Sequence, residues 1–223
     1  VLYTSGSTGR PKGIAHTHAS ALSFIDWCSD AFSPTENDRF SSHAPFHFDL
    51  SILDLFLPIK HGATLVLIGD DTAKQPLRLG PFIAEQRITV WYSTPSILRL
   101  LTEFGKLYQL DFPALRLVLF AGEVFPVKHL RSLKQAWPHP RYFNLYGPTE
   151  TNVCTAYELP SEISIDRTEP FPIGFACSGD RTMVVDEHEH DARHEAVRDP
   201  HLLAVDLPLR VADPLGSRLD PLH

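Results

Sequence analysis

The chain opens on a segment whose residue types are suited to binding phosphate. The stretch LYTSGSTGRPKG, residues 2–13, combines small hydroxyl side chains, three glycines and one lysine. Glycines allow successive backbone N–H groups to turn toward one centre and form a nest for an anion, and Lys12 adds a mobile positive charge. The spacing from Gly9 to Lys12 differs from a P-loop, in which the lysine directly follows the glycine. A flexible glycine and serine linker is the alternative interpretation.

A second segment, NLYGPTET (144–151), places a hydroxyl and a carboxylate directly after an expected strand. Gly147 and Pro148 indicate a turn, beyond which Thr149 can donate a hydrogen bond to a phosphate oxygen. Glu150 offers the hard oxygen ligand that Mg²⁺ accepts beside phosphate oxygens. Tyr146 has a flat apolar face on which an adenine ring could stack. The alternative is an ordinary turn with a solvated glutamate.

A glycine followed by a carboxylate also ends the expected strand of LFAGEVFP (119–126). Gly122 would let a flat ligand approach the backbone closely. The alternative is that Glu123 merely lies at a helix N-terminus, where its charge is favourable.

The segment PFHFDLS (45–51) sets one carboxylate, Asp49, among aromatic and aliphatic neighbours. A carboxylate in such surroundings suits a cation, for example the ammonium group of a ligand. Asp49 could instead cap a helix that begins at Leu50. His47 could line the same cavity, or it could be a structural histidine.

The elements that would position these segments alternate along the chain, which predicts an α/β fold with a largely parallel sheet and helices on both faces. The carboxyl ends of such strands bind ligands, and the segments around Asp49, Glu123 and Glu150 lie there. Turns or loops are expected at 33–40 and 69–76, and a partly extended stretch at 41–48. Strands are expected at 64–68, 88–93, 115–122 and 141–147, and helices at 18–32 (capped by Thr17), 49–59, 77–87 (flawed by Pro81), 94–105 and 126–137.

Composition excludes several classes of protein. The 223 residues carry a formal charge of −7 without a basic cluster, which argues against a nucleic-acid partner. No apolar run approaches the length of a membrane helix, so no membrane partner is expected. Three scattered cysteines provide no disulfide framework, which favours a cytoplasmic location. The chain begins with Val rather than Met, so we expect a piece of a longer protein.

The last segment, 186–223, loses the alternation and is predicted to be irregular. It starts as a polar tract in which His188, His190 and His194 have a spacing similar to that of metal ligands. The acidic residues around them favour a solvated, disordered run instead.

The order of the four motifs is more specific than any one of them. YTSGSTGRPKG, FHFDLS, AGE and NLYGPTET together resemble the adenylate-forming (AMP-dependent synthetase/ligase) superfamily. FDLS and YGPTETNVC are most similar to the amino-acid adenylation domains of nonribosomal peptide synthesis and to ligases that load alanine or proline onto a carrier protein. The resemblance identifies residues 1–185 as a partial adenylation domain, with the start of a small β subdomain in 171–187. Residues 186–223 form a divergent tail, for which a frameshift or a mispredicted exon is one hypothesis.

The resemblance implies a two-step reaction. The carboxylate of an amino acid attacks the α-phosphorus of Mg-ATP, pyrophosphate leaves, and an aminoacyl-AMP forms. The phosphopantetheine thiol of an acyl or peptidyl carrier protein then takes the acyl group. ATP and Mg²⁺ are therefore the expected cofactors, and an amino acid and a carrier protein are the expected partners.

The resemblance also implies roles for individual residues. Lys12, Thr149 and Glu150 would be catalytic, and Glu150 would bind Mg²⁺. Asp49 would pair with the α-ammonium group of the substrate and His47 would lie at the mouth of its pocket. ATP or AMP would contact Thr4, Ser5, Gly6, Ser7, Thr8, Gly9, Lys12, Gly122, Glu123, Asn144, Tyr146, Gly147 and Thr149. The pocket walls would be Leu50, Leu53, Ser96, Leu119, Ala121, Leu145, Val153 and Cys154, which suit a small or medium aliphatic amino acid.

Two alternatives remain open at this point. An acyl- or aryl-CoA ligase would share the motifs but would not need Asp49 as an ammonium partner. A catalytically dead nucleotide-binding protein would bind ATP without releasing pyrophosphate. The sequence has no Tyr-Arg-Thr-Gly-Asp stretch and no C-terminal lid with its lysine, so we expect this chain alone to be inactive.

Overall fold

The structure, a computed structural model, describes residues 1–4, 10–177 and 179–182. Its main feature is a seven-stranded sheet with the strand order β4-β3-β5-β6-β7-β8-β9. The strands are β3 (Arg39–Ser42), β4 (Thr64–Leu67), β5 (Val90–Ser93), β6 (Leu117–Phe120), β7 (Arg141–Tyr146), β8 (Thr155–Glu158) and β9 (Phe175–Ala176). The pairs from β4 to β7 are parallel, and β8 and β9 join in antiparallel register. The predicted α/β fold with a largely parallel sheet is confirmed.

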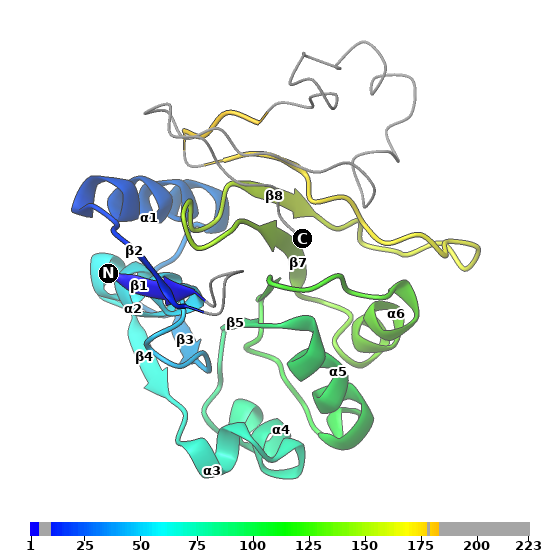
Figure 1. Cartoon of the computed structure of the whole chain (residues 1–223). Coiled ribbons are helices and arrows are strands. Elements are labelled where there is room, and N and C mark those ends of the chain that lie inside the picture. The colour runs from blue at the N-terminus through cyan, green and yellow to red at the C-terminus, as the bar shows by residue number, and fades with distance from the viewer. Residues whose placement is uncertain (5–9, 178, 183–223) are drawn as a thin grey trace.

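Helices cover both faces of this sheet (Figure 1). On one side lie α1 (His18–Phe32) and α2 (Leu50–His61), and on the other α4 (Pro76–Glu85), α5 (Pro95–Phe104) and α6 (Val127–Ala136). Side chains alternate along each strand, so Tyr92 and Leu119 pack under α1 and α2, whereas Trp91 and Val118 pack against the other helices. The sheet therefore separates two apolar cores, each formed by one set of side chains.

The strand order explains why ligand-binding loops gather in one place. From β3 the chain goes through α2 to β4 on one side, and then returns past β3 to form β5 on the other side. The connection after β3 covers one face of the sheet and the connection after β5 covers the other. A reversal of this kind is the point at which open α/β sheets bind ligands, next to the carboxyl ends of the strands.

Several boundaries differ from the sequence prediction for local reasons. The expected turn at 33–40 ends earlier, because Arg39 and Phe40 already belong to β3. They pair with Thr64 and Leu65 of β4. The expected loop at 69–76 contains a short helix, α3 (Asp70–Ala73), and a 3-10 helix, η1 (Leu107–Gln109), follows α5. Pro81 lies inside α4 without ending it. Thr17 caps α1 as predicted, in a capping box with Ser20.

The predicted phosphate loop belongs to a separate hairpin. Strands β1 (Leu2–Thr4) and β2 (Lys12–Ile14) pair antiparallel, with Thr4 opposite Lys12. Ser5, Gly6, Ser7, Thr8 and Gly9 lie outside the described residues, as do the tail from 186 onward and its histidines His188, His190 and His194. Of the small β subdomain expected in 171–187, the described residues show β9, which extends the main sheet.

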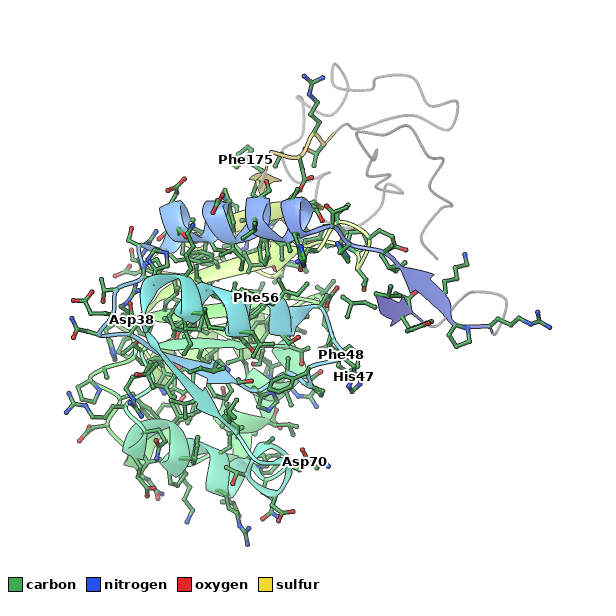
Figure 2. All side chains as sticks on the ribbon, turned by 90° about the vertical axis from the view of Figure 1, so that its left-hand side faces the viewer. Asp38, His47, Phe48, Phe56, Asp70 and Phe175 are labelled. Atoms are coloured by element: carbon green, nitrogen blue, oxygen red, sulfur yellow. The ribbon has the colours of Figure 1, made fainter. Side chains whose placement is uncertain are left out.

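One buried carboxylate joins the amino ends of three strands. Asp38, which is 4% exposed, accepts hydrogen bonds from the backbone N–H of Thr35 at 2.9 Å and from the Thr89 hydroxyl at 2.6 Å. Arg116 donates to both of its oxygens from Nε at 2.8 Å and Nη2 at 2.7 Å. Arg116 also donates to the carbonyl of Phe32 at the end of α1. Figure 2 shows Asp38 at the end of the sheet opposite His47.

We predict that Asp38→Asn destabilises the protein by about 2.5 kcal/mol at pH 7, because folding lowers the pKa of Asp38 by nearly two units and each unit is worth about 1.4 kcal/mol. Burial raises the pKa of Asp38, but hydrogen bonds from Arg116 and Thr89 outweigh it and lower the pKa to about 2. The stabilisation is therefore complete above the unfolded pKa of about 4 and is lost as the pH falls through the folded pKa. Calorimetry should show a melting-temperature difference that shrinks between these values. If the melting-temperature difference between the two proteins persisted in full at pH 2, it would not come from the ionised carboxylate of Asp38.

Candidate functional site

The predicted chemical segments follow three of four neighbouring strands at their carboxyl ends. Residues 43–49 follow β3, Thr94 follows β5, Gly122 and Glu123 lie just beyond β6, and Gly147 begins the loop after β7. Because β3, β5, β6 and β7 are parallel, these loops lie at one edge of the sheet. The side chains that could do chemistry are thus brought to a common place by topology.

The loop after β7 is held by backbone contacts. The N–H of Thr151 donates to the carbonyl of Pro148 at 3.0 Å, and Asn152 has a left-handed backbone with φ +65°. A β-carbon on Gly147 would collide with the carbonyl of Asn152, so this position requires glycine. The turn leaves Thr149 half-buried and Glu150 exposed. Among the described residues no cation pairs with Glu150, so its carboxylate is available to a ligand.

A contact that the sequence did not predict joins this loop to the hairpin. Nε2 of His16, just after β2, lies 2.6 Å from the carbonyl oxygen of Thr149. The two residues are 133 positions apart, and the only sequence signal was the place of His16 directly behind the Lys12 motif. The contact sets the base of the hairpin beside Thr149. Lys12 itself is exposed, and among the described residues no carboxylate pairs with it.

The segment after β6 turns sharply at Gly122. Its φ of +89° lies in the region that favours glycine. The carboxylate of Glu123 then accepts a hydrogen bond from the backbone N–H of Ser96 at 3.1 Å and another from the Ser96 hydroxyl. Glu123 thereby caps the start of α5, where Thr94 at the cap position makes no side-chain capping hydrogen bond.

Asp49 occupies the cap position of α2 but does not act as a cap. Its backbone is helical, with φ −64° and ψ −27°, and its side chain makes no capping hydrogen bond. The carboxylate is half-buried and has no ion-pair or hydrogen-bond partner among the described residues. His47 is exposed and lies against the ring of Phe48, with centroids 4.6 Å apart. The geometry thus leaves Asp49 available for a cation.

Most of the predicted pocket walls meet in one place. They belong to the apolar cluster between the sheet and helices α1 and α2, namely Leu53, Leu119, Ala121, Leu145 and Val153, with Leu50 at its margin. Cys154, which follows Val153 in the sequence, is fully buried. Burial raises the pKa of its thiol to about 11. Ser96 is the exception, since it is exposed and lies next to Glu123.

Tyr92 is a member of this cluster that the sequence did not single out. Burial raises the pKa of its phenol well above the usual value, and the carboxyl groups of Asp54 and Asp49 raise it further. Both carboxyl groups therefore lie within electrostatic range of one buried ring. On β7, the amide of Asn144 donates to the carbonyl of Pro172 at 2.9 Å, and burial raises the pKa of half-buried Tyr146.

A cavity of about 730 Å³ lies next to this edge but on the other side of the sheet. It runs from His43 and His47 to Asp70, and Leu79 and Leu101 of the opposite core form its floor. It does not contain the predicted walls of the acyl pocket. Over the described residues, no set of three or more His, Cys, Asp or Glu side chains is grouped to hold a metal ion. No helix within that part of the chain is long and apolar enough to cross a membrane.

Comparisons with known proteins agree with these motifs. A family model described as AMP-binding enzyme matches residues 1–197. An L-proline--[L-prolyl-carrier protein] ligase of Pseudomonas fluorescens is 48% identical over 81% of this chain and 36% of its own length. A D-alanine--D-alanyl carrier protein ligase of Bacillus velezensis is 36% identical over 84% and 37%. This chain therefore spans little more than a third of the length of these curated relatives.

A solved structure has the same arrangement. The Vibrio cholerae adenylation domain AlmE, in complex with glycyl-adenosine-5'-phosphate, superposes with a TM-score of 0.74 at 28% identity. The match covers 85% of this chain and 35% of that one. The sheet and its loops thus match a part of that adenylation domain.

We predict that Gly147→Ala destabilises the protein by about 1–3 kcal/mol, the usual cost of overpacking, because the new methyl group would meet the carbonyl of Asn152. The matched control is Gly69→Ala, since a β-carbon there meets no atom within 4 Å. Thermal unfolding of both variants should show a lower melting temperature for the first alone. Equal melting temperatures would show that the loop after β7 relaxes without cost.

Proposed function

Because the chain belongs to the AMP-binding enzyme family, we propose that residues 1–185 are part of an amino-acid adenylation domain. The complete enzyme would join the carboxylate of an amino acid to AMP, release pyrophosphate and pass the aminoacyl group to a carrier protein. The names of the relatives, which are ligases for L-proline and D-alanine and their carrier proteins, support this reaction class. The cytoplasmic location stays a prediction from the cysteine content.

The observation that carries this proposal is the position of Asp49. Its carboxylate, which has no partner within the part of the chain that the structure describes, precedes Leu50 and Leu53 of the apolar wall cluster. The loop with Thr149 and Glu150 follows β7 at the same edge of the sheet. An amino acid could therefore place its ammonium group on Asp49, its side chain among the walls and its carboxylate toward the nucleotide. The walls suit a small aliphatic side chain.

The first chemical step needs positioning and charge neutralisation rather than covalent catalysis. A carboxylate oxygen of the amino acid attacks the α-phosphorus of ATP, and the bond from that phosphorus to the bridging oxygen of the β-phosphate breaks. In our proposal Lys12 and residues 4–9 would hold the departing pyrophosphate. The hydroxyl of Thr149 would donate a hydrogen bond to the α-phosphate. Glu150 binds the Mg²⁺ that accompanies ATP, as a single carboxylate beside phosphate oxygens can.

The nucleotide base would lie between the ends of β6 and β7. Gly122 leaves the backbone open on one side, and Tyr146 offers an aromatic face on the other. Asn144 would border the same space, although its amide is bonded to Pro172. In the second step the phosphopantetheine thiol of the carrier protein would attack the acyl carbon and AMP would leave.

We predict ATP–pyrophosphate exchange by the full-length protein that contains this chain, with a preference for small aliphatic amino acids in a panel. The 223-residue chain on its own should show no exchange, because it spans little more than a third of the length of the curated relatives that it matches. Glu150→Gln in the full-length protein should lower the exchange rate at least tenfold, since it removes the carboxylate for Mg²⁺. ATP binding without any exchange would favour a catalytically dead nucleotide-binding protein.

Asp49→Ala distinguishes amino-acid activation from the activation of other acids. The substitution should raise the KM for the preferred amino acid about tenfold or more, because a charged hydrogen bond is worth about 1.5–3 kcal/mol. The same variant should be unaffected toward the corresponding acid without an amine. Kinetics of adenylate formation with both substrates measure this. Wild-type protein that prefers the acid without an amine would instead indicate an acyl- or aryl-CoA ligase.

A further inference from the structure

The hairpin of β1 and β2 has little apolar packing to hold it in place. Over the described residues its two strands pair with each other and not with the seven-stranded sheet. None of its described residues is buried, and Val1 and Tyr3 are 80% and 70% exposed. Figure 2 shows the hairpin ahead of α1, apart from the sheet and on the same side of the molecule as His47. Its position must therefore be fixed in another way.

His16, just after β2, provides a polar contact in place of that packing. Its Nε2 lies 2.6 Å from the carbonyl oxygen of Thr149. A carbonyl oxygen can only accept a hydrogen bond, so Nε2 carries the hydrogen and donates it. Within the part of the chain that the structure describes, no other hydrogen bond joins residues 1–4 and 10–16 to another element. This contact therefore ties the described hairpin to the loop after β7.

The acceptor belongs to a loop that is closed without the hairpin. The backbone N–H of Cys154 donates to the carbonyl of Tyr146 at 2.9 Å and joins the two ends of the loop. Thr149 is thus a fixed point to which the hairpin can be attached. Because His16 binds the backbone carbonyl of Thr149, the hydroxyl of the same residue stays available to a phosphate oxygen.

We propose that His16 is a positioning residue that sets the hairpin with Lys12 against the loop with Thr149. The inference rests on the proposed function, which assigns the departing pyrophosphate to the hairpin and the α-phosphate to Thr149. The bond that breaks lies between these two groups, so a shift of one segment against the other would misalign the reacting atoms. His16 acts through the backbone and contacts neither the amino acid nor the nucleotide.

The test measures ATP–pyrophosphate exchange by variants of the full-length protein. His16→Ala removes the donor and should raise the KM values for ATP and for pyrophosphate about three- to tenfold, the effect of one neutral hydrogen bond. The KM for the amino acid and the inhibition constant of AMP should be unchanged, because neither ligand includes the pyrophosphate. His16→Gln keeps an N–H donor near the end of its side chain and should restore most of the lost affinity.

His139→Ala is the matched control. Nε2 of His139 lies 3.0 Å from the carbonyl oxygen of Phe112, so this variant also removes a contact between a histidine and a backbone carbonyl. His139 precedes β7, whereas the loop with Thr149 follows that strand. His139→Ala should therefore leave the KM values for ATP, pyrophosphate and the amino acid unchanged.

Unchanged KM values for ATP and pyrophosphate in His16→Ala, an equal rise in the KM for the amino acid, or no recovery in His16→Gln would overturn the proposal. Wild-type protein without exchange would instead count against the proposed function. In that case, amide hydrogen exchange of residues 2–4 and 12–14 tests the contact on its own. Faster hydrogen exchange in His16→Ala than in His139→Ala supports the positioning role, and equal hydrogen exchange refutes it.

Discussion

The arrangement of the loops depends on the ion pair between Asp38 and Arg116 at the amino ends of the strands. Asp38 precedes β3, Thr89 precedes β5 and Arg116 precedes β6, so one carboxylate ties together the amino ends of three strands. In a parallel sheet, a register fixed at one end fixes the other end as well. The loops that carry Asp49 and Glu123 are therefore positioned by a contact at the opposite ends of their strands.

The two faces of the sheet differ in whether they contain predicted site residues. The face under α1 and α2 collects the predicted pocket walls, together with the buried polar groups Tyr92 and Asp54. The opposite face is packed by α4, α5 and α6 and contains no predicted site residue in its core. Glu123 and Ser96 connect the two sides, because the end of β6 caps the first turn of α5. Helix packing on one side thus supports a loop that belongs to the site on the other.

The sequence predicts the motif-bearing loops well and the contacts between them poorly. The positions of Asp49, Glu123 and Thr149 in loops after strands could be predicted because residue type and position after a strand are both local properties. The contact of His16 with Thr149 was missed because it joins residues 133 positions apart. Tyr92 and Asp54 were missed because their importance comes from burial beside one another, which periodicity indicates only as a core face. Ser96 was expected in the wall set, whereas the cap that it forms with Glu123 takes it to the surface.

Glu123 has two roles in our account, one beside the proposed nucleotide site and one as the cap of α5, and any substitution would affect both. A carboxylate at the end of β6 borders the space proposed for the nucleotide, and its oxygen already serves the free backbone N–H of Ser96. A shorter, neutral or apolar side chain would change the nucleotide environment and also uncap α5. Engineering of nucleotide preference should therefore start at Asn144 or Tyr146, where the side chain supports no helix, and leave Glu123 in place.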